Sequence, residues 1–532
     1  MWSLLEREIK PEEVTLEPLP TDWDIIEAYK LYEASELEAA PPELNPFPTV
    51  KEYPTYRVFS KAVIAMNPID GERRYFVIEE KMNKQEKEIY DLVVDILSSE
   101  IMAPDEIKDR EKYLALEATR IAKKYKIKLK ETVSWPKIIY YIKRNLLGYG
   151  PIDGLMRDPN IEDISCDGVG VPVYIWHRRY ESMKTNIIFN SEEYLDEFIV
   201  KLVHRAGKHI STAFPIVDVM LEGKHRLAAS YRREITPKGG TFTIRKFREK
   251  PYTIVDLINF GVLTSEMAAY LWMAMEYKKA ILIIGATAAG KTTLLNALSC
   301  MIRPEAKIIT VEETAELRLP HENWIEFISR PAYGLGVSKE TGGGIELFDL
   351  VVTSLRHRPD YIIVGEIRGR EAYALIQAIA TGHGGLTTFH ADSVEAAIKR
   401  FTQKPLDIAP AYIPLVKIAI LLGRVNLPNG RMARRIKRVD EIIDYDGANL
   451  QKNTVFWWNA GRDLFIGDLT KSRVLKEIAI ETARTIPDII NEIREREALI
   501  EEMIKRNVTD YREIGRMIRE YYLRKIKTTI KM

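Results

Sequence analysis

The feature that most constrains this chain is a glycine-bounded loop between an apolar run and a helix-forming run, ILIIGATAAGKTTLLNAL at 281–298. The loop matches the pattern GxxxxGK[ST]. Small side chains let successive backbone N–H groups turn toward one anion, and the N-terminus of the next helix adds partial positive charge. KKAILIIG predicts a buried strand and TTLLNALSCMI a helix. The sequence therefore predicts an α/β domain that binds the phosphates of a nucleotide.

Within this loop we expect Lys291 to reach the β- and γ-phosphates of ATP, and the Thr292 hydroxyl to be a ligand of Mg²⁺. A chance match is the alternative, which the flanking strand and helix disfavour. The residues predicted to bind ATP are Gly285, Ala286, Thr287, Ala288, Ala289, Gly290, Lys291, Thr292 and Thr293.

A second apolar run, in RPDYIIVGEIRG at 358–369, predicts a buried strand at 361–364 that is followed by Glu366. Hydrolysis needs a group that orients or deprotonates water. Gly365 stands where many such ATPases carry an Asp, so Glu366 is predicted to be both the catalytic carboxylate and a Mg²⁺ ligand. A glutamate that only ends a strand is the alternative.

Two more polar groups follow strand-like runs. The run at 308–311 ends in Glu312 and Glu313, a carboxylate pair predicted to act in catalysis by holding water or Mg²⁺, although a solvated turn has the same pattern. In ATGHGGLTTFHADS, His383 and His390 flank a Gly-Gly loop and an extended run, which predicts a phosphate-sensing loop with a catalytic His390. A structural role for either histidine is the alternative.

Composition excludes several classes of protein. A chain of 532 residues exceeds one core, so several domains are expected. Lys plus Arg total 78 and Asp plus Glu 77, a balance that disfavours a nucleic-acid coat. The two cysteines, Cys166 and Cys300, form no CxxC pair, which disfavours a zinc site. No apolar run reaches the roughly 18 residues of a membrane span, and no signal peptide is expected.

The pattern changes along the chain in a way that predicts its organisation. Alternation at 56–80 predicts a hairpin, and 247–258 carries a proline and predicts a linker. Beyond the linker, β-branched runs alternate with helical ones, which predicts a parallel sheet with covering helices. The remaining expectations are helices at 86–145, short strands at 148–247 and helices at 474–531.

The order of the motifs, phosphate loop, VEETAEL, RPDYIIVGEIRG and TGHGGLTTFHADS, resembles the type II/type IV secretion ATPase superfamily, the hexameric motors of pili, secretion systems and archaella. The likeness spans about 145–446 and includes LLGYGPIDGLMRDPNIEDISCDG, which is similar to the archaeal branch. The sequence lacks the tetracysteine insert of many bacterial members. The long N-terminal extension favours the archaellum (archaeal flagellum) motor and assembly ATPase; a type IV pilus assembly or type II secretion ATPase is the alternative.

The resemblance implies an α/β fold with a RecA-like P-loop NTPase domain, a smaller α/β (PAS-like) N-terminal domain and a mostly helical N-terminal extension. The implied bounds are 1–130 for the extension, 131–248 for the small domain and 256–532 for the ATPase domain with C-terminal helices. The small domain is implied to supply arginines to the site, with Arg232 and Arg245 as the predicted catalytic pair. Further candidates are Arg226, Arg233, Arg356, Arg358 and Arg368.

The resemblance also implies a homo-oligomer, a hexamer, that works with an integral membrane platform protein and accessory filament-motor proteins. The expected location is cytoplasmic, at the inner face of the membrane through these partners, with no span of its own. A DNA translocase is less favoured and no nucleic acid is expected, because the most basic stretch, GRMARRIKRVDEIIDYD, alternates charge with apolar residues and predicts a strand pair at the edge of the core. A module that holds ATP without cleaving it is disfavoured by Glu366 and the two histidines.

Overall fold

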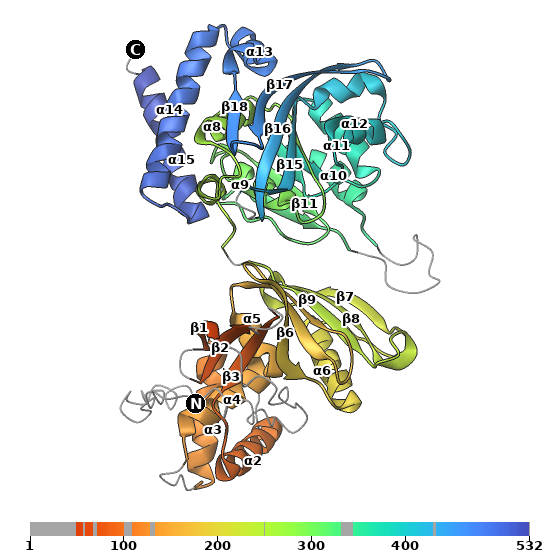
Figure 1. Ribbon diagram of the computed structural model, residues 1–532, viewed down its shortest axis with the longest axis vertical. Helices are drawn as coiled ribbons and strands as arrows, with labels where there is room; N and C mark the ends of the chain where they lie inside the picture. Colours follow the sequence, from red (N-terminus) through yellow and green to blue (C-terminus); the bar gives the residue numbers. More distant parts are fainter. Residues whose placement is uncertain are drawn as a thin grey trace. The chain divides into compact units, whose positions relative to one another are not determined.

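The computed structural model describes residues 49–56, 59–66, 72–100, 109–127, 133–248, 250–330, 344–428 and 432–530. The chain divides into two compact units, Met1–Arg248 and Glu249–Met532, called unit 1 and unit 2 below (Figure 1). The division falls inside the segment 247–258 for which the sequence predicts a linker. Each unit has its own sheet and its own hydrophobic core.

Among the described residues of unit 1, nine strands form one sheet in the order β1-β2-β3-β6-β5-β4-β9-β8-β7. The pairs are antiparallel except β3–β6, which is parallel. The strands are β1 (Thr49–Tyr56), β2 (Ser60–Met66), β3 (Arg73–Glu79), β4 (Ile161–Cys166), β5 (Pro172–His177), β6 (Glu181–Ile188), β7 (Ile216–Met220), β8 (Arg226–Ser230) and β9 (Thr241–Arg245).

The hairpin predicted at 56–80 is confirmed, because β2 and β3 pair antiparallel with Ser60 opposite Glu79; its turn lies outside the described residues. The helices that accompany the sheet include α6, whose apolar side chains join the core of the sheet through Leu195 and Ile199. The α-helices in the described part of unit 1 are α2 (Lys84–Glu100), α3 (Arg110–Lys124), α4 (Trp135–Ile142), α5 (Asp153–Arg157) and α6 (Glu192–Arg205).

The sheet of unit 1 crosses the domain boundary predicted at residue 130. Strands β1, β2 and β3 precede that residue, yet β3 pairs with β6 through Arg74–Lys184 and Tyr75–Thr185. The side-chain amide of Asn186 adds bonds to both the backbone N–H and the C=O of Val77. The described part of the extension thus holds strands as well as α2 and α3, and the PAS-like character of the small domain stays a prediction.

Unit 2 is built on a second sheet, in the order β12-β11-β13-β14-β10-β15-β16-β17-β18. The pairs from β12 to β15 are parallel, and those from β15 to β18 are antiparallel. The strands are β10 (Ile281–Ile284), β11 (Ile308–Glu312), β12 (Trp324–Ile328), β13 (Tyr361–Val364), β14 (Gly384–Phe389), β15 (Ile418–Asn426), β16 (Met432–Tyr445), β17 (Leu450–Asn459) and β18 (Leu464–Gly467).

The central strands of unit 2 are buried on both faces, as expected for a parallel sheet covered by helices. Ile281 and Ile283 of β10 pack in one core cluster, whereas Leu282 and Ile284 pack in another. This split follows the two-residue period of a strand. The predicted alternation of strands and helices is therefore confirmed, with helices on each side of the sheet.

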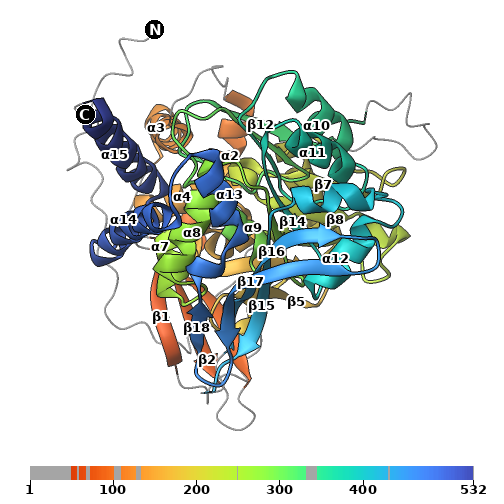
Figure 2. The same ribbon diagram turned by 90° about the horizontal axis from the view of Figure 1, so that it is seen from above.

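The helices of unit 2 fall into two groups. One group, with α8, α14 and α15, shares its core cluster with Ile281 and Ile283, and the other, with α10, α11 and α12, shares a cluster with Leu282 and Ile284 (Figures 1 and 2). The helices are α7 (Ile254–Asn259), α8 (Ser265–Glu276), α9 (Lys291–Ser299), α10 (Leu347–Leu355), α11 (Glu371–Ala380), α12 (Val394–Phe401), α13 (Arg473–Glu481), α14 (Ile486–Lys505) and α15 (Tyr511–Ile530).

Two sequence predictions for this unit have clear outcomes. The helical C-terminal region is confirmed by α13, α14 and α15. The basic stretch predicted to be a strand pair at the edge is instead one strand, β16, paired with β15 on one side and β17 on the other. Its alternation of charged and apolar residues reflects one long strand with a buried and an exposed face. No helix in the described part of the chain is both long enough and apolar enough to cross a membrane.

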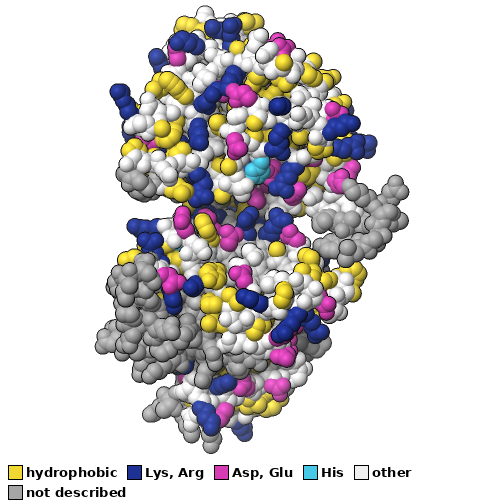
Figure 3. All heavy atoms as spheres, turned by 45° about the vertical axis from the view of Figure 1, so that its right-hand side comes forward, with side chains coloured by type: hydrophobic (Ala, Val, Ile, Leu, Met, Phe, Trp, Pro, Cys, Tyr) yellow, Lys and Arg dark blue, Asp and Glu magenta, His cyan; other side chains and the backbone are white. Residues whose placement is uncertain are grey.

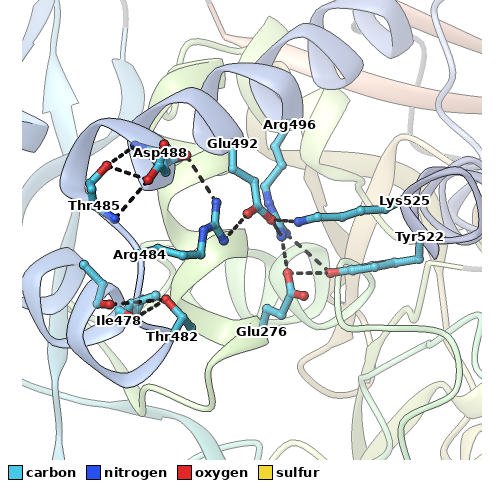
Figure 4. A network of polar contacts seen from close by, with 11 residues as sticks. Glu276, Ile478, Thr482, Arg484, Thr485, Asp488, Glu492, Arg496, Tyr522 and Lys525 are labelled. Carbon is cyan, nitrogen blue, oxygen red and sulfur yellow. Dashed lines mark hydrogen bonds and ion pairs between the residues drawn. The ribbon is translucent and has the colours of Figure 1, made fainter. Parts of the chain in front are cut away.

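A buried arginine attaches the C-terminal helices α14 and α15 to the rest of unit 2. The buried stripe of α14 contains Ile489, Ile493 and Ile500, and Arg496 occupies the same stripe with no exposed side chain. A buried guanidinium needs charged partners. Figure 4 shows it between Glu276 of α8 and Glu492 of α14.

These contacts form one network across three helices. Arg496 pairs with Glu276 and, at 2.7 Å, with Glu492. Glu492 is also paired with Lys525 of α15 and with Arg484 at 2.6 Å. Burial alone raises the pKa of Glu492, but the charges of Arg496 and Lys525 outweigh it and lower that pKa to about 2. Helices α8, α14 and α15 are thus held together by charges that would be costly to separate.

Replacing Arg496 with Ala should destabilise α14 by about 3–5 kcal/mol, because it leaves the buried Glu492 and the partly buried Glu276 without this counter-charge. The free energy of opening measured by native-state hydrogen exchange of the α14 amides reports this directly. The control is Arg506→Ala, whose ion pair with Glu502 is about half exposed, and which should change the same quantity by less than about 1 kcal/mol. Equal effects of the two variants would contradict the proposed importance of the network.

Candidate functional site

The predicted site residues of unit 2 gather where neighbouring parallel strands end. The register places Val311 opposite Val364, Val364 opposite Thr387, and Ile284 opposite Phe389. Strands β11, β13, β14 and β10 therefore end at the same edge of the sheet. The residues that follow them are the carboxylates after β11 and β13, the histidine after β14 and the phosphate loop after β10.

The loop between β10 and α9 has the backbone expected of an anion cradle. Ala288 and Gly290 both have positive φ, 60° and 95°. Successive N–H groups can converge on one anion in such a conformation. A Cβ on Gly285 would lie 2.4 Å from the carbonyl oxygen of Leu422, so the loop packs directly against β15. This explains why the first position of the motif must be glycine.

Lys291 begins α9 and its amine is held inside the loop. Its Nζ donates to the carbonyl oxygen of Ala286 at 3.1 Å and lies 3.2 Å from Nδ1 of His390. Burial lowers the pKa of Lys291, while the charge of Glu366 acts in the opposite direction. The amine is thus placed over the cradle, where a phosphate oxygen could replace the carbonyl.

Glu366 and His390 meet above the ends of β13 and β14. Nε2 of His390 lies 2.8 Å from Oε1 of Glu366. The contact has an ion-pair distance but not the alignment of a hydrogen bond, and Oε1 is buried without an aligned donor. Burial lowers the pKa of His390, and the charge of Lys291 lowers it further. The arrangement leaves one carboxylate oxygen able to accept a proton or a water molecule.

Arg368, two residues after Glu366, joins this group to the end of β11. Its guanidinium lies 2.6 Å from Oε2 of Glu366 and 3.4 Å from Oε2 of Glu313. Lys291, His390, Glu366, Arg368 and Glu313 therefore form one continuous chain of contacts. The structure brings together the predicted residues Lys291, Glu366, Glu313 and His390.

Glu312 lies beside this chain but its carboxylate faces the backbone. Oε1 accepts from the N–H groups of Glu316 at 3.0 Å and of Leu317 at 3.1 Å. A Cβ on Gly365 would lie 3.1 Å from its Cγ, so the absence of a side chain there makes room for it. Burial raises the pKa of Glu312 to about 8. Its predicted role in holding water or Mg²⁺ stays a prediction.

Several other predicted residues lie at the opposite edge of the sheet. His383 precedes β14, and its Nδ1 is 3.0 Å from the carbonyl oxygen of Ala378. Arg356 and Arg358 precede β13, whereas Arg368 follows it. Of the two histidines, only His390 is therefore near the phosphate loop.

The predicted arginines of unit 1 each contact a carboxylate within that unit. Arg232 lies 3.3 Å from Asp196, and Arg245 lies 3.1 Å from Asp163. Two of the further candidates form similar ion pairs, Arg226 with Asp218 and Arg233 with Glu192. Their predicted role at the nucleotide stays a prediction.

Two arginines near the site escaped the sequence analysis. Arg400 of α12 donates to the carbonyl oxygen of His390, and its guanidinium stands 4.6 Å from the centre of the Phe389 ring. Arg434 of β16 donates through Nε to the carbonyl oxygen of Ala288 at 3.2 Å. Neither belongs to a recognisable motif. The one sequence feature that could have indicated Arg400 is its place as the seventh residue of the helix that follows TTFH.

The oxygen groups at the site suit a magnesium ion bound together with a nucleotide. Thr292 follows Lys291 in the first turn of α9, and Glu366 has a buried oxygen without an aligned donor. Mg²⁺ prefers oxygen ligands and is usually held by one or two side chains plus phosphates. The described residues contain no cluster of three or more His, Cys, Asp or Glu that could hold a metal by itself.

Comparison with known proteins identifies related sequences. Residues 174–413 match the sequence model of a family described as type II/IV secretion system protein. An uncharacterized protein of Methanocaldococcus jannaschii, MJ0900, is 36% identical over 396 residues, 73% of this chain and 70% of that protein. A second from the same organism, MJ1287, is 40% identical over 268 residues, 50% of this chain and 96% of that protein. The structure of the Legionella pneumophila ATPase DotB, 16% identical, aligns with 68% of this chain and 92% of its own, with a TM-score of 0.42.

Replacing Glu312 with Gln should remove a pH dependence of stability. Folding raises the pKa of this carboxyl from 4.5 to about 8, so its contribution to stability is complete below about pH 4.5 and is lost as pH rises through 8. Thermal unfolding midpoints at pH 5 and pH 8.5 check this. The unfolding midpoint of Glu312→Gln minus that of the wild type should be higher at pH 8.5 than at pH 5 by more than about 2 °C.

The matched control is Glu313→Gln, which changes the exposed neighbour in the same way. It should keep the pH dependence of the wild type. A Glu312→Gln curve parallel to that of the wild type would show that the buried carboxyl does not titrate as described.

Proposed function

The chain belongs to the type II/IV secretion ATPase superfamily, and from this premise we propose that it is an ATP-hydrolysing motor. The observation that carries the proposal is the meeting of Lys291, His390 and Glu366 at one edge of the sheet. A phosphate cradle alone binds a nucleotide. A carboxylate within reach of the same cradle supplies the group that activates water.

Nucleotide binding begins with an exchange of contacts at Lys291. In the free protein its amine is occupied by the Ala286 carbonyl oxygen and by His390. The β- and γ-phosphates replace these partners, since a charge-assisted bond to phosphate is stronger than a bond to a neutral carbonyl. His390 is then released to contact the γ-phosphate, so it senses whether that group is present.

Hydrolysis follows from the position of Glu366. Its Oε2 is held by Arg368, which fixes the orientation of the carboxylate, while Oε1 has no aligned donor. Oε1 therefore accepts the proton of the attacking water. Mg²⁺, held by Thr292 and the phosphates with Glu366 nearby, would neutralise charge on the phosphoryl group. Arg368 also contacts Glu313, which links the strand ends of β11 and β13.

Transition-state charge on the γ-phosphate needs cations as well. We assign this role to Arg232 and Arg245 of unit 1, as the resemblance implies. Each guanidinium is more than half exposed in its ion pair, 53% for Arg232 on the buried Asp196 and 69% for Arg245 on Asp163, so water weakens both pairs. Exchange of such a partner for a phosphate couples the position of unit 1 to the nucleotide.

The full proposal is a homohexamer that turns this coupling into force on an integral membrane platform protein, with accessory filament-motor proteins, at the cytoplasmic face of the membrane. We favour assembly or rotation of an archaellum-type filament. Assembly of a type IV pilus, or type II secretion, is the second candidate. Purification of the tagged chain from native membranes decides between them by whether an archaellum or a pilin platform protein is recovered.

A DNA translocase is disfavoured by the distribution of charge. On the face of the molecule in Figure 3, Asp and Glu side chains lie among the Lys and Arg side chains. Neutralising several phosphates of DNA needs clustered cations. Salt-dependent retardation of DNA in a gel would favour this class instead.

Glu366→Gln should lower the rate of phosphate release from ATP by about 10²-fold or more, because the amide accepts no proton. Binding of ATP should persist, since Lys291 and the loop are unchanged. The measurements are steady-state phosphate release and equilibrium binding of a fluorescent ATP analogue.

Glu322→Gln is the control, because this side chain is 87% exposed and forms only a 3.8 Å contact with Arg519. It should retain the rate of the wild type. Full turnover by Glu366→Gln would contradict the catalytic role assigned to Glu366. A wild-type chain that binds ATP without releasing phosphate would be a nucleotide-binding module and not an ATPase.

A further inference from the structure

Two arginines face each other beside the phosphate loop. Arg424 of β15 and Arg434 of β16 are register partners in the antiparallel pair that flanks β10. Both side chains are exposed. Directly opposite residues of an antiparallel pair point to the same face of the sheet, and like charges there are destabilising. Such a pair persists most readily where an anion binds between or beside the two cations.

No carboxylate compensates these two cations within the residues that the structure describes. Neither has an ion pair there, and the hairpin sequence LPNGR that joins their strands contains no acidic residue. Two other arginines of β16 provide the contrast. Arg435 is paired with Asp463 and Arg438 with Asp440, each at 2.8 Å. The hairpin thus leaves unpaired the two arginines that are cross-strand partners.

Arg434 is already in contact with the phosphate loop. Its Nε donates to the carbonyl oxygen of Ala288, and its Cδ would lie 3.3 Å from a Cβ at Gly290. Only one of its five N–H groups is used in this bond. Its terminal nitrogens therefore carry charge at the rim of the cradle, with donors to spare.

The topology places these arginines on the other side of the loop from the catalytic groups. Glu366 and His390 follow β13 and β14, which lie on one side of β10, whereas β15 and β16 lie on the other. Lys291 and Glu366 serve the β- and γ-phosphates. The loop itself cradles the α- and β-phosphates. A cation on the β15 side is therefore placed for the α-phosphate end of the nucleotide.

We propose that Arg434, supported by Arg424, is a further subsite for the bound nucleoside polyphosphate, at the end where its α-phosphate lies. The subsite strengthens binding without taking part in cleavage, since β16, the strand of Arg434, is separated from β13, which Glu366 follows, by three strands of the sheet, β14, β10 and β15. This inference rests on the proposed function in one respect, that the loop binds a nucleotide.

The test compares the affinities of ADP and of the non-hydrolysable analogue AMP-PNP for the full chain by calorimetry. Arg434→Gln should weaken both about tenfold and by similar factors, because both ligands contain the α-phosphate. Arg424→Gln should weaken both less, and Arg434→Lys should restore part of the loss. KM for ATP should rise, while kcat at saturating ATP should stay within about twofold of the wild type.

Lys437→Gln is the matched control, because it removes one exposed positive charge from the same strand. It should leave both affinities within about twofold of the wild type. Arg434→Gln should also lower the slope of log affinity against log salt more than Lys437→Gln does. The circular dichroism spectrum of each variant checks that it is folded.

Three results would overturn the inference. In the first, the affinities of Arg434→Gln match those of the control. In the second, kcat falls while the affinities stay unchanged, which would assign Arg434 to the shape of the loop alone. In the third, Arg434→Gln loses self-association while its affinity for ADP is unchanged, which would mean that the arginines contact another copy of the chain. A wild type that binds ADP but releases no phosphate would contradict only the proposed function; a wild type that binds neither ligand would contradict both proposals.

Discussion

The site depends on the register of four parallel strands. Because Val311, Val364, Thr387 and their neighbours are aligned across the sheet, the residues that follow β11, β13, β14 and β10 meet at one edge. A shift of one residue in any strand would reverse which face its side chains occupy. The two core clusters on the two faces of the sheet oppose such a shift. The chemistry at the edge is therefore maintained by apolar packing beneath it.

At that edge, charged groups hold one another in the absence of phosphate. Lys291 is satisfied by Ala286 and His390, and Glu366 by Arg368. The two contacts of Lys291 can be exchanged for contacts with phosphate oxygens, since a charge-assisted bond replaces another polar bond. Arg368 stays on Glu366 and keeps its carboxylate oriented. A bound nucleotide can therefore rearrange the contacts of the site. The buried network around Arg496 is different, because its charges have no external partner to exchange with.

Much of this arrangement could be predicted from the sequence. The phosphate loop and the strands before Glu366 and Glu313 are local patterns of apolar and small residues, and the structure confirms those strands. The direction of Glu312 could not be predicted, because two adjacent glutamates at a strand end look alike until the following turn supplies N–H groups to one of them. Arg434 could not be found either. It reaches the loop from 146 residues away, through a hairpin whose basic residues look equivalent in sequence.

The central claim is that a nucleoside triphosphate takes Lys291 away from His390. The most direct measurement is the pKa of His390, followed by NMR of a ¹³C-histidine-labelled chain with and without a non-hydrolysable ATP analogue, and assigned with His390→Gln. In the free protein, burial and the charges of Lys291, Arg368 and Arg400 lower this pKa, and Glu366 opposes them. Bound phosphates neutralise Lys291 and add negative charge, so the account predicts that the pKa rises. An unchanged pKa at saturating analogue would contradict it.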